Sequence, residues 1–187
     1  MNKITVSFEA TPNPAAMKFA FSAPIAQESG EFNDAQSTER SPLAAKIFGF
    51  PWVSQVFIGP QMVTITKQDW VDWKVLATPL SGLLAEHINS GSAVFSEMQK
   101  DSEEADQIHE NDSEIVKQIK RVLAAEIKPV VQLDGGDISF VKFENDNLYL
   151  QLKGACSTCP SSQATLKDGI EVRIRQVFPN IKEVLAI

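Results

Sequence analysis

The chain of 187 residues has little cysteine, no long apolar run and no excess of basic residues. Its two cysteines are too few for the disulfide frameworks of small secreted domains. Apolar runs of about 18 or more residues are absent, which argues against a membrane-spanning helix. No basic stripe is present to hold phosphates, which argues against nucleic-acid binding. The composition, 43% hydrophobic and 22% charged, is typical of a soluble globular protein.

The acidic residues concentrate in one segment. Eight acids and one lysine lie between Glu97 and Glu114 and account for the whole net charge of −7. Such a segment has too little apolar surface to offset the entropy of ordering, so residues 97–112 are predicted to form a flexible linker. The linker divides the chain into an N-terminal domain, residues 1–96, and a C-terminal domain, residues 113–187.

The N-terminal domain is predicted to mix strands and helices. Strands are expected over residues 4–10, 18–22, 55–58 and 62–66, the last two forming a hairpin. Ser41, with a proline after it, predicts the start of a helix over residues 42–49. Residues 23–39 predict mostly irregular structure. Asp69 predicts the cap of a short helix, and apolar spacing over residues 80–88 predicts another.

The C-terminal domain is predicted to have the order α-β-β-α-β. The expected elements are a helix over residues 114–128 that Pro129 ends, strands over residues 138–144 and 147–153, a helix from Pro160 and a strand over residues 181–187. This order predicts an α/β (α+β) domain with helices on one face of a three-stranded sheet.

The two cysteines, Cys156 and Cys159, belong to the single motif GACSTCP at residues 154–160. The motif is predicted to be a surface loop between a strand and a helix. Thiolates are favoured close to a helix start, and the spacing lets both side chains reach one metal. The motif therefore predicts a site for a metal ion or an iron–sulfur cluster.

The number of ligands suggests a dimer. A tetrahedral zinc ion or a [4Fe–4S] cluster takes four protein ligands, whereas one chain offers two cysteines. Two chains that each contribute Cys156 and Cys159 would complete the set, which favours a metal or cluster shared across a symmetric dimer. Two alternatives stay open: a dithiol–disulfide oxidoreductase and a zinc-bridged structural dimer.

The motif and its surroundings resemble a known family. Residues 133–138 (LDGGDI), 154–160 (GACSTCP) and 161–171 (SSQATLKDGIE) are similar to the C-terminal domain of NifU-like (Nfu-type) iron–sulfur proteins. Residues 11–14 (TPNP) and 63–67 (VTITK) are similar to the Nfu N-terminal domain.

The resemblance implies an iron–sulfur cluster scaffold or carrier, not an enzyme. It would bind a labile [4Fe–4S] cluster between two subunits through Cys156 and Cys159. The expected partners are an upstream cluster-assembly scaffold, apo iron–sulfur target proteins and a second copy of the chain.

The first residues lead to an expectation about location. Residues 1–8 alternate polar and apolar side chains, without the apolar centre of a signal peptide or the arginines of a transit peptide. They predict a strand, and the protein is expected in the cytoplasm.

Overall fold

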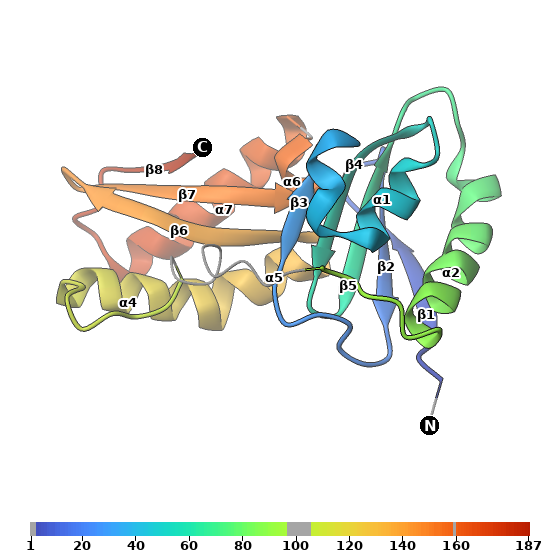
Figure 1. The fold of residues 1–187 in the computed structure, drawn as a ribbon. Helices are drawn as coiled ribbons and strands as arrows, with labels where there is room; N and C mark the ends of the chain where they lie inside the picture. The colour runs from blue at the N-terminus through green and yellow to red at the C-terminus, as the bar shows by residue number, and fades with distance from the viewer. Residues whose placement is uncertain (1–2, 97–105, 159) are drawn as a thin grey trace. The chain divides into compact units, whose positions relative to one another are not determined.

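A computed structural model describes residues 3–96, 106–158 and 160–187, and the side chains of these residues outside 158–167. The chain forms two compact units, Met1–Gln99 and Lys100–Ile187 (Figure 1). Each unit has its own sheet and its own hydrophobic core, as expected of an α+β protein. Within the described residues, no helix is long and apolar enough to cross a membrane.

The N-terminal unit is built on an antiparallel sheet of five strands in the order β1-β2-β5-β4-β3. The strands are β1 (Val6–Ala10), β2 (Ala16–Phe21), β3 (Gly30–Phe32), β4 (Val53–Gly59) and β5 (Met62–Lys67). The predicted hairpin is confirmed, since β4 pairs directly with β5 and Gly59 lies opposite Met62. One face of the sheet packs against the helices around Phe19 and Ile65.

The first helix begins as its sequence predicts. α1 (Pro42–Phe48) has Pro42 in its first turn, and the side-chain oxygen of Ser41 accepts a hydrogen bond from the amide of Ala44 at 3.1 Å. The Ser41 hydroxyl also donates to the carbonyl of Val94 at 2.6 Å, which ties the helix start to the end of the unit. Leu43 and Ile47 then face the core.

The second helix differs from the prediction. α2 (Trp73–Asn89) is one helix of 17 residues, and Asp72, not Asp69, caps it by accepting from the amide of Lys74. Pro79 lies within this helix. A proline removes one backbone hydrogen bond, but buried Leu80 and Leu84 hold the helix on the core and offset that loss. The predicted short helix and last helix are therefore a single element.

Residues 23–39 contain more regular structure than expected. β3 falls in this range, and the 3-10 helix η1 (Gln36–Arg40) begins in it. β3 has three residues and pairs with β4 at the edge of the sheet. A strand this short leaves no clear alternation in the sequence, which is why periodicity does not find it.

The C-terminal unit confirms the predicted α-β-β-α-β order with additional short elements. These are α4 (Glu114–Val122), η2 (Leu123–Ile127), α5 (Lys128–Leu133), β6 (Gly136–Glu144), β7 (Asn147–Gly154), α6 (Ala155–Thr158), α7 (Pro160–Val177) and β8 (Glu183–Ala186). The sheet order is β6-β7-β8, with β6 and β7 antiparallel and β7 and β8 parallel. Asn145 and Asp146 both have positive φ, which a tight hairpin turn of this kind needs.

The first helical region of this unit runs past Pro129, contrary to the prediction. α4 leads into the π-helical turn η2 and then into α5, in which Pro129 occupies the first turn. A proline at the start of a helical segment loses no required hydrogen bond, and the wider turn before it supplies the needed shift in register. The helical region therefore ends at Leu133, the first residue of the LDGGDI segment (residues 133–138).

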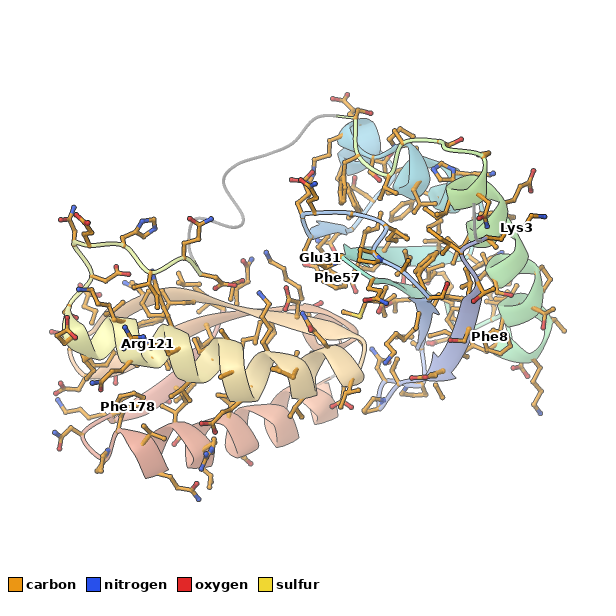
Figure 2. The ribbon with its side chains drawn as sticks, turned by 90° about the horizontal axis from the view of Figure 1, so that it is seen from below. Lys3, Phe8, Glu31, Phe57, Arg121 and Phe178 are labelled. Atoms are coloured by element: carbon orange, nitrogen blue, oxygen red, sulfur yellow. The ribbon has the colours of Figure 1, made fainter. Side chains whose placement is uncertain are left out.

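The helices cover one face of the three-stranded sheet. The core joins Ile119, Leu123, Ile127 and Val131 of the first helical region to strand residues such as Ile138 and Leu150 and to Ile170, Ile174 and Phe178. Phe178, labelled in Figure 2, follows α7 and is buried. On β7 the side chains alternate, so that Leu148, Leu150 and Leu152 are buried while Gln151 is exposed.

Part of the predicted linker contacts the C-terminal unit. Lys120 donates to the carbonyl of Gln107 at 2.7 Å and to the carboxylate of Asp112 at 2.9 Å. Residues 97–105 lie outside the described residues, and the flexibility of the linker stays a prediction.

Candidate metal-binding site

Cys156 lies where strand β7 turns into helix. Gly154 ends the strand with φ of 71°, a left-handed conformation that favours glycine. The amide of Ala155 then donates to the carbonyl of Gly135 at 3.2 Å, which ties this turn to the turn before β6. Residues 155–158 form the four-residue helix α6 instead of the predicted loop.

Cys156 is also more buried than the sequence predicts. It is 3% exposed and belongs to the hydrophobic core, whereas we expected its loop at the surface. Gly136 lies against it: a Cβ at that glycine would come within 2.7 Å of the Cys156 sulfur and 2.7 Å of the Lys153 carbonyl oxygen. The absence of a side chain at Gly136 therefore provides the space that the thiol occupies.

The other predicted ligand, Cys159, lies outside the described residues. Helix α7 begins at the next residue, Pro160. The pairing of Cys156 and Cys159 as ligands stays a prediction. Across the residues that the structure does describe, no group of three or more His, Cys, Asp or Glu side chains is placed to hold a metal ion.

Charged side chains form a cluster beside Gly136. Lys128 contacts Asp106 at 2.9 Å and Asp137 at 3.6 Å. The second carboxylate oxygen of Asp106 accepts from the amide of Phe140 at 2.8 Å, so Asp106 also holds strand β6. The cluster joins the segment before α4 to the strand whose first residue packs against Cys156.

The pKa values in this cluster are shifted by burial and by charge. Burial raises the pKa of Asp137, although the charge of Lys128 acts in the opposite direction. Burial alone would lower the pKa of Lys128, but the nearby Asp137 and Asp106 outweigh it and raise the pKa. Oδ1 of Asp137 is buried without a hydrogen-bond partner among the described residues. The cluster thus holds a carboxylate at a cost in desolvation.

Sequence analysis did not find this cluster. Lys128 and Asp106 are far apart along the chain, and Asp106 lies in the segment assigned to the linker. Lys128 meets Asp137 because α5 runs on to Leu133 and the chain then turns back into β6, and that continuation of the helix was not predicted. No local spacing signals the contact.

Comparison with known proteins places both units in one class. Residues 119–185 match the family model of the NifU-like domain, and residues 6–91 match that of the scaffold protein Nfu/NifU N terminal. A chain that carries both belongs to the Nfu-type proteins with two domains. The sequence resemblance is thereby confirmed.

The chain belongs to the NifU-like (Nfu) family, and curated relatives support this along most of its length. It is 37% identical to NifU-like protein 5, mitochondrial, of Arabidopsis thaliana, over 96% of this chain and 66% of the relative. It is 35% identical to a NifU-like protein of Schizosaccharomyces pombe, over 100% of this chain and 74% of the relative. It is 35% identical to the human protein named NFU1 iron-sulfur cluster scaffold homolog, mitochondrial, over 93% of this chain and 68% of the relative.

The relatives contradict the expected cytoplasmic location. The relatives from Arabidopsis thaliana and human are named mitochondrial proteins. The expectation rested on the first eight residues of this sequence, and these relatives are longer than the chain. The first strand of this chain, β1, is part of the N-terminal fold, and such a strand carries no information on the cellular compartment.

Proposed function

We propose that this protein is an iron–sulfur cluster scaffold or carrier that binds a labile [4Fe–4S] cluster through Cys156 and Cys159. The observation that carries the proposal is the position of Cys156 at the junction of β7 and α6, inside a chain of the Nfu family. The cluster is cargo: it is received from an upstream assembly scaffold and passed to apo-proteins.

The ligand count supports a cluster shared by two chains. A [4Fe–4S] cluster is held by four thiolates, and the sequence has two cysteines. Two copies related by a two-fold axis supply the four ligands, with Cys156 and Cys159 from each chain. Four ligands from one chain would need two donors other than thiols, because Cys156 and Cys159 are the two cysteines of the sequence.

Transfer proceeds by exchange of thiolate ligands. A thiol of the apo-protein loses its proton and binds an iron of the cluster, while Cys156 or Cys159 leaves that iron and takes up a proton. Each exchange keeps the number of iron–sulfur bonds and of protons constant, so no oxidant or reductant is needed. Repetition at the remaining irons moves the whole cluster to the acceptor.

The burial of Cys156 requires that helix α6 opens before a ligand can leave or bind. The thiol is 3% exposed and sits on a helix of four residues. So short a helix gains little from its own hydrogen bonds, and its opening is among the least costly motions of a fold. We expect α6 to rearrange when the cluster is bound or released.

Anaerobic reconstitution with iron and sulfide tests the proposal. We expect a brown protein with about two irons per chain, because one cluster of four irons is shared by two chains. Cys156→Ala and Cys159→Ala should each abolish cluster binding. The matched control is Ser157→Ala, which removes the hydroxyl that donates to the Gly154 carbonyl at 2.9 Å but keeps both thiols.

Other outcomes point to the two alternatives. Colourless protein with one bound zinc per dimer, lost together with the fold on chelation, would indicate a structural zinc site. A monomer without iron whose two thiols oxidise and reduce reversibly would indicate a dithiol oxidoreductase. Either result would overturn the proposed function while leaving the family assignment intact.

A further inference from the structure

Helix α5 has two exposed apolar side chains close to Cys156 of the cysteine motif. Val130 is 54% exposed and Leu133 is 72% exposed, although Val131 between them is fully buried. Residues three apart on a helix lie on the same face, so Val130 and Leu133 form one apolar surface, here named the α5 pair. Two adjoining exposed apolar side chains near a functional site form a small surface that a protein contact can bury.

The α5 pair is joined to the cysteine site by a short structural path. Leu133 ends α5, and two residues later the carbonyl of Gly135 accepts the amide of Ala155 at 3.2 Å. The next residue, Gly136, packs against the Cys156 sulfur. The end of α5 is thus close to Cys156 along the backbone, where a second chain that contributes ligands could contact it.

We propose that the α5 pair contacts the α5 pair of a second copy of this chain when the two copies share a cluster. The inference rests on the proposed function, because the second copy is the occupant that brings the two missing thiolates. A two-fold axis through the cluster places the same surface of each copy against the other. The two apolar pairs then exclude water beside the cluster.

The size of the α5 pair predicts that the contact forms only together with the cluster. Two partly exposed aliphatic side chains offer on the order of 100 Å² of apolar surface per copy. A stable protein interface buries about 800 Å² per partner. The pair alone is therefore too small to hold a dimer, and we expect a monomer without cluster and a dimer with it.

The test uses neutral substitutions, which leave the charge around the cluster unchanged. The single variant Leu133→Gln and the double variant Leu133→Gln with Val130→Gln remove the apolar contact. Glutamine is uncharged and forms helices well, so α5 should be kept. The control is Val172→Gln, because Val172 is 59% exposed on α7. It lies 12 residues after the start of that helix, roughly 18 Å along its axis. Thermal unfolding of all variants without cluster should match the parent chain within a few degrees.

Sedimentation under anaerobic conditions then measures the dimer dissociation constant of the reconstituted proteins. We expect Leu133→Gln to raise it at least about tenfold, since each dimer loses two leucine contacts, and the double variant to raise it further. Val172→Gln should leave it unchanged.

Three results would overturn the inference. A bridged dimer of unchanged affinity in both α5 variants would show that the pair is not a dimer contact, while the proposed function would stand. An unchanged dimer with slower cluster transfer to an apo-ferredoxin would assign the pair to an acceptor protein. A parent chain that binds no cluster would overturn the proposed function and the inference together.

Discussion

The substitution Gly136→Ala tests how the fold positions Cys156. The added Cβ would lie 2.7 Å from the Cys156 sulfur, 2.7 Å from the carbonyl oxygen of Lys153 and 3.2 Å from the Cys156 Cβ. The Lys153 carbonyl oxygen belongs to the backbone of β7, which pairs with β6 so that Gly136 lies opposite Gly154. This oxygen cannot rotate away as a side chain could. Overpacking of this kind costs about 1–3 kcal/mol.

We expect Gly136→Ala to lower the free energy of unfolding of the C-terminal unit by that amount and to reduce the cluster content after reconstitution. Urea unfolding measures the first effect, and iron per chain measures the second. The second effect follows because the added Cβ would displace Cys156 from the turn between β7 and α6, the segment that we propose rearranges to bind the cluster.

A second glycine in the same unit provides the control. Gly169 lies inside α7, and an added Cβ would meet no heavy atom within 4 Å. Gly169→Ala should therefore stabilise the unit by about 0.5–1 kcal/mol and leave the cluster content unchanged. Equal stability and equal cluster content in Gly136→Ala and the parent chain would refute the argument that this glycine makes room for the thiol.

Three further predictions concern contacts away from the thiol. Lys128→Met leaves buried Asp137 and partly buried Asp106 without their cation, and should lower the free energy of unfolding by about 2 kcal/mol at neutral pH, as urea titration can show. Burial raises the pKa of Asp137 in the folded chain, so this carboxyl ionises at a lower pH in the unfolded chain than in the folded one. Its contribution to stability therefore falls as pH rises from 3.8 towards the raised pKa. Asp137→Asn should therefore gain stability relative to the parent chain across that window, and a constant difference would contradict the assignment. Ser41→Ala removes the cap of α1 and the bond to Val94, and should lower the unfolding temperature of the N-terminal unit through a loss of about 1–2 kcal/mol.

Where local chemistry decides the structure, the sequence was sufficient. The serine and proline at residues 41 and 42 start α1 because each satisfies a requirement of a helix end. Asn145 and Asp146 adopt the positive φ values that a two-residue hairpin turn needs. The α-β-β-α-β order follows from such signals.

The prediction did not include the two helical regions that continue past a proline. Pro79 lies inside α2, and Pro129 lies in the first turn of α5 after a π-helical turn. In both places the packing of apolar side chains against the core decides the outcome, and a local rule does not include that energy. For the same reason, the contact of Lys128 with Asp137 was not predicted.

The residues of the candidate site can be proposed from the sequence, but the environment of Cys156 cannot. The spacing of Cys156 and Cys159 identifies the motif from the sequence alone. The burial of Cys156 depends on its packing against Gly136. The pairing of β6 with β7 brings Gly136, at the start of β6, next to the end of β7, which Cys156 follows closely. Such long-range contacts leave no local pattern in the chain.

Native mass spectrometry of the anaerobically reconstituted full chain shows directly whether two chains share one cluster. We expect a species of two chains with one [4Fe–4S] cluster, absent in Cys156→Ala and in Cys159→Ala. A cluster held by a single chain, or a bridged species that persists in either cysteine variant, would contradict it.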